Sequence, residues 1–226
     1  MLYPSIVVDD FFSQPELIVD FASKLKFSQN KDGRWPGSRT ESLHINHQTF
    51  FDYVNTKILS IVYPNDINYF NNFKLEANTY FQKIPGERYP NTGWVHKDPD
   101  YITAIIYLSK HKGCGTSLCK KISYNEGILT EEELVNEKIK FYKKENYDSN
   151  ETKYLKSNNQ NFKKLLTVDS EYNRLFLFDP HNWHCAESFN DENVKEDRLT
   201  LISFISHIYI NNKKIKYPIV ESRRLD

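Results

Sequence analysis

The feature that most constrains the fold is a series of short segments with strand character, which fills the last two-thirds of the 226-residue sequence. Residues 101–109 read YITAIIYLS, and β-branched and aromatic side chains of this kind are typical of a buried strand. In residues 75–81 apolar and polar positions alternate, as they do in a strand with one buried face. Further segments of strand character are residues 116–122, 165–168, 174–178 and 198–209. This succession of short strands favours a β-sandwich or a jelly roll.

Helical periodicity is found in the first third of the chain. Apolar residues recur at helical spacing over residues 17–25 and again over residues 50–62. We expect the first of these helices to begin at Ser13, which can cap it, with Pro15 in the first turn, where no N–H is missed. Helices followed by many strands predict an α+β protein, in which the N-terminal helices pack on one sheet of the jelly roll.

Residues 122–164 differ in composition from the rest of the chain, because they are rich in Lys, Glu and Asn. Residues 130–133, TEEE, have the spacing of a capping box, which marks the start of a helix. We interpret residues 122–164 as an inserted helix and loop and not as a second domain. The sequence therefore predicts a single domain over residues 1–226, with a helical support region in residues 1–70 and a jelly-roll core in residues 72–210.

Charge and cysteine content exclude several classes of function. Lys and Arg number 30 and Asp and Glu number 30, so the formal net charge is zero and gives no strong signal for nucleic acid or an anionic membrane. The three cysteines, Cys114, Cys119 and Cys185, are too few for a disulfide framework and fit a reducing compartment. Neither a signal-peptide pattern nor an apolar run of spanning length is present, so we expect a soluble, cytoplasmic protein.

Candidate metal ligands lie in the segment Gly93 to Asp98, GWVHKD. On an extended strand residues i and i+2 face the same side, so the His96 imidazole and the Asp98 carboxylate would converge on one point. A third ligand would complete a two-histidine, one-carboxylate triad, which suits Fe(II) and leaves coordination positions open. His181 and His184 both follow a buried strand segment and are the candidates, although each would also fit an ordinary loop.

Arg198 opens the apolar segment 198–205, RLTLISFI. A buried guanidinium is costly unless it is paired with an anion. The partner could be a protein carboxylate, and Glu196 and Asp197 are adjacent. It could instead be a dicarboxylate ligand held in a bidentate fork.

In this order, the H-x-D pair, the distal histidine and the arginine resemble the Fe(II)- and 2-oxoglutarate-dependent dioxygenases, specifically their prolyl 4-hydroxylase-like branch. The strand Tyr107-Leu108-Ser109, followed by Gly113-Cys114-Gly115, is similar to the Tyr-Leu and Gly-Gly turn of that family. The stretches VVDDFF, PELIVDFA and WPGSR are similar to an uncharacterised bacterial and phage subgroup. The resemblance covers residues 75–119 and 172–206, with weaker support near residues 5–40.

The resemblance implies a double-stranded β-helix in which His96, Asp98 and His184 bind iron. It favours His184 over His181 because the family histidine follows the last strand phenylalanine, here Phe178, at the spacing that His184 has.

The same resemblance implies 2-oxoglutarate as co-substrate and raises the question of ascorbate as a further requirement. Arg198 would hold the distal carboxylate of 2-oxoglutarate, and Thr200 or Tyr107 would donate a hydrogen bond to it.

Substrate contacts are predicted for residues that flank the two histidines, namely Arg88, Tyr89, Trp94 and Trp183. Aromatic side chains beside a metal site can stack on a proline ring or on a base, although core packing at the barrel mouth would explain them as well. Trp35 and Arg39 lie in the Gly- and Pro-containing loop 29–40, which we considered as a lid or as a simple connector.

The function predicted from the resemblance is hydroxylation of a peptide or protein substrate at proline, with release of succinate and CO2. One alternative is a hydroxylase of a free amino acid, a small metabolite or a nucleobase. The other is a cupin-like barrel that binds a metal without oxygenase chemistry.

Overall fold

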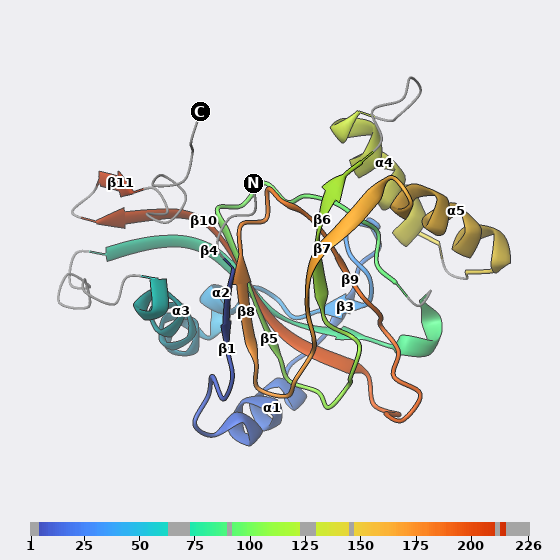
Figure 1. The fold of residues 1–226 in the computed structure, drawn as a ribbon. Coiled ribbons are helices and arrows are strands. Elements are labelled where there is room, and N and C mark those ends of the chain that lie inside the picture. The colour runs from blue at the N-terminus through green and yellow to red at the C-terminus, as the bar shows by residue number, and fades with distance from the viewer. Residues whose placement is uncertain are drawn as a thin grey trace.

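Two antiparallel β-sheets form the centre of the computed structural model, which describes residues 5–62, 73–89, 92–122, 130–144, 147–210 and 213–215 (Figure 1). The major sheet has eight strands, which run in the order β1 (Ile6–Val8), β8 (Leu175–Phe178), β5 (Ile102–Tyr107), β10 (Arg198–Ile210), β4 (Phe73–Ile84), β3 (Ser38–Arg39) and β2 (Ser28–Gln29), with β11 (Lys213–Ile215) paired to β10. The minor sheet has the order β7 (Phe162–Val168), β6 (Thr116–Lys121) and β9 (Trp183–Ala186). An isolated bridge adds His96 beside β9.

Successive strands alternate between the two sheets. From β4 in the major sheet the chain passes to His96 in the minor sheet, back to β5, across to β6 and β7, back to β8, across to β9 and back to β10. This winding is that of a jelly roll, or double-stranded β-helix. The predicted α+β fold class with a jelly-roll core is confirmed.

The N-terminal helices cover the outer face of the major sheet. They are α1 (Pro15–Ser23), α2 (Leu43–Asn46) and α3 (Gln48–Val62). Residues of β10 alternate, so Leu199, Leu201 and Ile205 join the α3 side chains in one hydrophobic core, and the other face of the strand is left for the barrel interior. The cap predicted at Ser13 is wrong, because the residue preceding α1 is Gln14, and it makes no capping hydrogen bond through its side chain.

A buried polar network ties α3 to the major sheet. The Asn55 amide donates to Thr79 Oγ1 at 3.0 Å and to the Phe51 carbonyl at 2.9 Å, and Ser203 Oγ donates to Asn55 Oδ1 at 2.6 Å. Each of these polar side chains lies in the core, where an unpaired hydroxyl or amide is costly.

We expect Asn55→Ala to lower the free energy of unfolding by about 2 kcal/mol, because it removes the amide from a buried network and leaves the Thr79 and Ser203 hydroxyls with only each other as partners. Urea denaturation followed by circular dichroism measures this loss. The exposed Asn46 hydrogen-bonds only Glu41 among the described residues, so Asn46→Ala should stay within about 0.5 kcal/mol of the wild type. Equal effects of the two substitutions would show that the network contributes nothing.

The insertion carries two helices where the sequence predicted one. These are α4 (Glu131–Tyr142) and α5 (Ser149–Asn159), which lie beside the minor sheet and away from α3 (Figure 1). The predicted capping box is present: Glu133 N donates to Thr130 Oγ1, and Thr130 N donates to the Glu133 carboxylate. A second capping box, at Asp148 and Glu151, starts α5. The part of the predicted loop in residues 123–129 lies outside the described residues.

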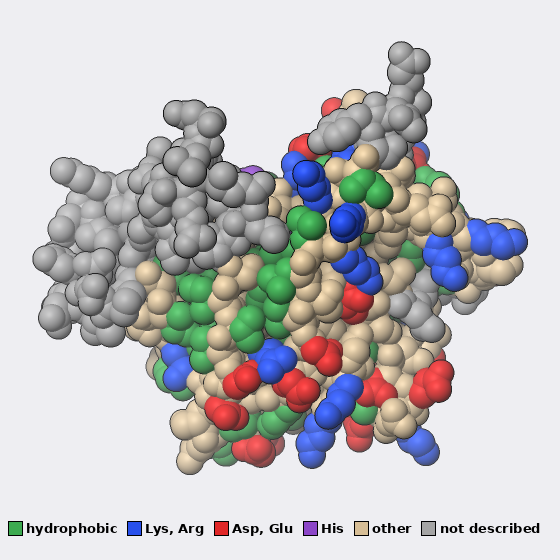
Figure 2. Space-filling view, viewed as in Figure 1, with side chains coloured by type: hydrophobic (Ala, Val, Ile, Leu, Met, Phe, Trp, Pro, Cys, Tyr) green, Lys and Arg blue, Asp and Glu red, His purple; other side chains and the backbone are tan. Residues whose placement is uncertain are grey.

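The surface mixes charges of both signs. On the face shown in Figure 2 the acidic and basic side chains are interspersed, in keeping with the zero net charge. None of the described helices is both long and apolar enough to cross a lipid bilayer.

Candidate metal centre

Two histidines face each other across a pair of backbone segments at the barrel opening. His96 N donates to the His184 carbonyl at 3.0 Å, and His184 N donates to the His96 carbonyl at 2.8 Å. Residues that exchange both backbone bonds are directly opposite in an antiparallel pair, so their side chains project on the same face. The two imidazole centroids lie 4.4 Å apart as a result.

Asp98 completes the cluster. It lies two residues after His96 on the same extended segment, as the i, i+2 rule predicts. Its Oδ1 is 3.7 Å from His96 Nε2 and its Oδ2 is 3.2 Å from His184 Nε2. One ligand atom from each of the three residues lies within 4.8 Å of the other two.

The backbone fixes which nitrogen of each ring is free. His96 Nδ1 lies 2.8 Å from the Trp94 carbonyl, and His184 Nδ1 lies 2.9 Å from the Asn182 carbonyl. A carbonyl oxygen only accepts, so each Nδ1 donates and the Nε2 of a neutral ring presents a lone pair. Two such lone pairs then face a carboxylate, and this is the donor set and orientation of a metal site.

The electrostatic surroundings of His96 and Asp98 favour the protonation states in which these two residues bind metal ions. Burial, together with the charge of Lys138, holds the pKa of His96 well below its ordinary value. Burial alone would raise the pKa of Asp98, but His96, His184 and the Lys138 ammonium hold it well below its usual range. A neutral imidazole and an ionised carboxylate are the forms that bind metal ions.

The structure brings His184, and not His181, to the other two ligands. The His181 side chain is 55% exposed, and its Nδ1 contacts Asp179 Oδ1 at 2.9 Å. His184 lies on β9 instead of in a loop, with a side chain only 6% exposed. His184, which the resemblance favoured over His181, is thus the histidine that lies beside His96 and Asp98.

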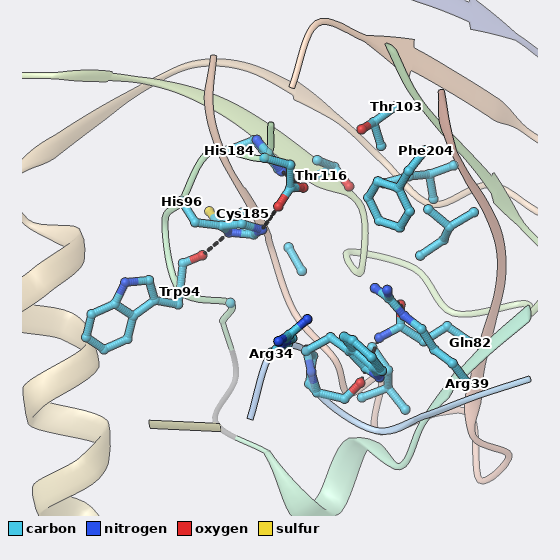
Figure 3. Close-up of a pocket in the computed structure, with 18 of the residues that line it drawn as sticks. Arg34, Arg39, Gln82, Trp94, His96, Thr103, Thr116, His184, Cys185 and Phe204 are labelled. Atoms are coloured by element: carbon cyan, nitrogen blue, oxygen red, sulfur yellow. Dashed lines mark hydrogen bonds and ion pairs between the residues drawn. The ribbon is translucent and has the colours of Figure 1, made fainter. Parts of the chain in front are cut away.

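A cavity of about 390 Å³ extends from this cluster between the two sheets. Its floor is the inner face of the major sheet, with Tyr80 and Gln82 from β4, Ile105 from β5 and Phe204 from β10. Figure 3 shows His96 and His184 on one wall, with Arg39, Gln82 and Phe204 on the wall that faces it.

Arg198 lines the same cavity at the start of β10. It is 5% exposed, and its Nε donates to the Cys114 carbonyl at 3.0 Å. No carboxylate among the described residues forms an ion pair with it, so neither Glu196 nor Asp197 is the partner considered from the sequence. Burial lowers the pKa of Arg198 from its ordinary value.

Tyr107 and Thr200 lie next to Arg198. The Tyr107 ring centroid is 5.5 Å from the guanidinium carbon, and its hydroxyl donates to Thr116 Oγ1 at 2.9 Å. Thr200 is opposite Tyr107 in the β10–β5 register. Its Oγ1 is buried and has no hydrogen-bond partner among the described residues.

Of the four predicted substrate-binding residues, Trp94 alone is among the described residues that line the cavity. Tyr89 is buried in the hydrophobic cluster that also contains Trp94, and its hydroxyl accepts a hydrogen bond from Gly37 N at 2.7 Å. Arg88 lies just before it in the short 3-10 helix η2 (Gly86–Arg88). Trp183 packs against Phe162 with ring centroids 4.8 Å apart.

The sequence of this chain matches a known protein family. Residues 3–205 match a protein family described as a family of unknown function, DUF6445. The chain belongs to the DUF6445 family. A search of curated proteins finds no match.

Solved structures similar to this DUF6445 protein share its fold at low sequence identity. SnoN, a non-heme α-ketoglutarate-dependent epimerase from nogalamycin biosynthesis, gives a TM-score of 0.51 at 11% identity over 92% of this chain and 81% of SnoN. HygX from Streptomyces hygroscopicus, with nickel and 2-oxoglutarate bound, gives a TM-score of 0.50 at 12% identity over 90% of this chain and 83% of HygX. A prolyl hydroxylase from Trichoplax adhaerens, in complex with a hypoxia-inducible factor peptide, gives a TM-score of 0.50 at 12% identity over 89% of this chain and 83% of the hydroxylase. These likenesses establish the fold.

Of the cations that line the cavity among the described residues, Arg34, Arg39 and Lys138 were not assigned to the site from the sequence, and Arg39 was considered only as part of a lid. Arg39 belongs to β3, which the sequence indicated only as part of a loop, and Lys138 belongs to α4 of the insertion. A signal for Lys138 was present, because it lies four residues after Leu134 and four before Tyr142, on the buried side of the helix. No comparable pattern marked Arg39.

Proposed function

We propose that this DUF6445 protein is an Fe(II)- and 2-oxoglutarate-dependent oxygenase that hydroxylates a substrate C–H bond. The observation that carries the proposal is the presence, in one cavity, of a His-Asp-His cluster and of a buried arginine that pairs with no carboxylate among the described residues. A hydrolytic or structural metal site has no need of a fixed cation beside it.

The residues present fit a metal ion of this kind. His96, Asp98 and His184 supply two nitrogens and one carboxylate from one side, and this set suits Fe(II) while leaving further coordination positions to other ligands. Both Nδ1–H groups are held by backbone carbonyls, so ring orientation does not depend on the metal.

The residues present also fit 2-oxoglutarate. Arg198 offers N–H groups to a distal carboxylate, and a bidentate fork is the geometry in which guanidinium groups bind carboxylates. The unpartnered Thr200 Oγ1, two residues along the same strand, would donate to that carboxylate and so gain the hydrogen bond it lacks.

When bound, Fe(II) with 2-oxoglutarate and O2 supplies the oxidation of the substrate C–H bond, with release of succinate and CO2. The protein contributes position and seclusion. Arg198 and Thr200 would fix the distal carboxylate of the co-substrate, and His96, Asp98 and His184 would hold the metal ion. Trp94 is 1% exposed: its carbonyl orients the His96 ring, and its own ring packs against Phe141.

Succinate release tests this proposal directly. Protein loaded anaerobically with Fe(II) should convert 2-oxoglutarate to succinate slowly once oxygen is admitted, and ascorbate should be included in one arm of the assay. Protein shown to hold iron that releases no succinate would instead be a metal-binding barrel without oxygenase activity.

For the substrate, we propose peptidyl proline as the first candidate, on the basis of the resemblance to the prolyl 4-hydroxylase-like branch. A proline-containing peptide should then accelerate succinate release and gain the mass of one oxygen atom. A free amino acid or another small acid is the second candidate. Two further cations in the cavity favour it: Arg39, which forms no ion pair among the described residues, and Lys138, whose Nζ lies 3.9 Å from Asp98 Oδ1.

A further inference from the structure

Arg39 stands on the cavity wall opposite the metal ligands, and aromatic rings surround it. The guanidinium carbon is 4.4 Å from the Trp35 ring centroid, 5.2 Å from that of Phe204 and 5.5 Å from that of Tyr80. Rings over the guanidinium leave its edge as the direction of approach for a ligand. A planar carboxylate meets such an edge in the same plane, through two parallel hydrogen bonds.

The hydrogen-bonding capacity of Arg39 is only partly used. Its Nε and one terminal nitrogen donate to the same acceptor, Gln82 Oε1, at 3.3 and 3.2 Å. A guanidinium has five N–H groups, and no carboxylate among the described residues forms an ion pair with this one. Gln82 is itself held by donation to the Pro36 carbonyl at 2.7 Å, so the side of Arg39 that it contacts is fixed.

Lys138 brings a second cation to the same space from the insertion. Its Nζ lies 3.9 Å from Asp98 Oδ1, and its side chain is 13% exposed. Lys138 and Arg39 line the same cavity. When Asp98 binds a metal ion, Asp100 is the one other carboxylate among the described residues that line the cavity.

We propose that Arg39 and Lys138 form an anion site that binds a carboxylate of the substrate beside the metal centre. This inference rests on the proposed oxygenase function, and it names the substrate class: a compound whose reactive C–H bond lies within reach of a carboxylate. Arg198 is assigned to the co-substrate, so the Arg39 guanidinium is free for the substrate. A buried cation without a partner is unfavourable, and a bound carboxylate removes this cost.

Binding measurements on nickel-loaded protein test the site without turnover. Isothermal titration calorimetry, with Ni(II) and 2-oxoglutarate present, would compare L-proline, L-leucine, L-lysine and L-glutamate with their α-carboxamides. A second arm would compare proline-containing peptides that carry either Asp or Asn beside the proline. We expect acids to bind at least tenfold more tightly than their amides in one of the two arms. The arm in which this preference is found distinguishes a free acid from a peptide substrate.

The variants Arg39→Met and Lys138→Met should each weaken binding of the preferred acid about 30-fold and leave amide binding nearly unchanged. Arg39→Lys should recover part of the loss, because it keeps the charge without the fork. The matched control is Lys140→Met, since Lys140 lies on α4 with its side chain 70% exposed and pairs with Glu137 outside the cavity.

Three results would overturn the anion site. The first is equal affinity for acids and amides in both arms, and the second is loss of acid binding in Lys140→Met to the same degree as in Lys138→Met. The third is loss of 2-oxoglutarate affinity in Arg39→Met comparable to that in Arg198→Met, which would make Arg39 a co-substrate residue. Failure of the wild-type protein to bind 2-oxoglutarate at all would instead refute the proposed function on which the site rests.

Discussion

His184→Ala is expected to abolish stoichiometric binding of Fe(II), whereas His181→Ala should bind it as the wild type does. Of these two histidines, His184 is the one whose Nε2 faces Asp98, at 3.2 Å. It is also the one whose backbone pairs with that of His96. Substitutions of residues that merely orient a ligand cost about 10- to 100-fold in metal affinity, so loss of a ligand itself should cost more. Equilibrium dialysis against Fe(II) under argon, with metal analysis, measures this.

The pair of variants is well matched. Both histidines lie in the same eight-residue stretch between β8 and the end of β9, and His181 is exposed enough that its removal costs little stability. Iron binding that survives in His184→Ala, or that vanishes in His181→Ala, would show that the third ligand has been misassigned. Loss of succinate release with iron retained would point to a different defect, because the ligand cluster would still be intact.

Arg198→Met is expected to weaken 2-oxoglutarate binding on the order of 100-fold, because it removes the cation from a buried charge pair. The ligand-free variant should be no less stable than the wild type, since the wild-type guanidinium is buried without an anion. In the wild type, 2-oxoglutarate at 100 times its Kd should add about 2.7 kcal/mol to the free energy of unfolding. The variant should show almost none of this gain in thermal melts at the same concentration.

Arg174 supplies the control for this measurement. It precedes β8, lies outside the cavity lining and pairs with Asp9, its Nε 2.5 Å from Asp9 Oδ1. Arg174→Met should therefore lose a little stability and keep its response to 2-oxoglutarate. A variant of Arg198 that still gains stability from 2-oxoglutarate would remove this residue from the co-substrate site, whatever its effect on turnover.

Local pattern predicted most of the sheet residues and failed where pairing is imposed from elsewhere. The β-branched run of β5 and the long apolar strand β10 were readable because their side chains are buried on both faces or alternate. The four residues of β9 come shortly after Pro180 and Asn182 and show no such pattern. They form a strand because they pair with β6. The hairpin of β2 and β3 looked like a loop because its Gly and Pro content dominates, although β4 pairs with it.

The candidate site divides along the same line. His96 and Asp98 were predictable because their convergence depends only on strand periodicity. Arg39 and Lys138 come from segments outside the barrel, and only the docking of those segments brings them into the cavity. Tyr89 is the converse case. It was predicted as a substrate contact because it is near His96 in sequence, but its hydroxyl accepts a hydrogen bond from Gly37 of the hairpin. There Gly37 has a φ of 75°, and an added Cβ would lie 2.1 Å from the Lys83 carbonyl.

The two backbone hydrogen bonds between His96 and His184 also affect how the minor sheet is completed. The segment of His96 joins the minor sheet through its bridge with β9, and hydrogen bonds from Gly93 N to the Ala186 carbonyl and from Asp98 N to the Pro180 carbonyl flank that bridge. The same two residues that complete the ligand cluster thus also close the sheet at its edge. An ion bound by both His96 and His184 would therefore add its binding free energy to the pairing of these two segments.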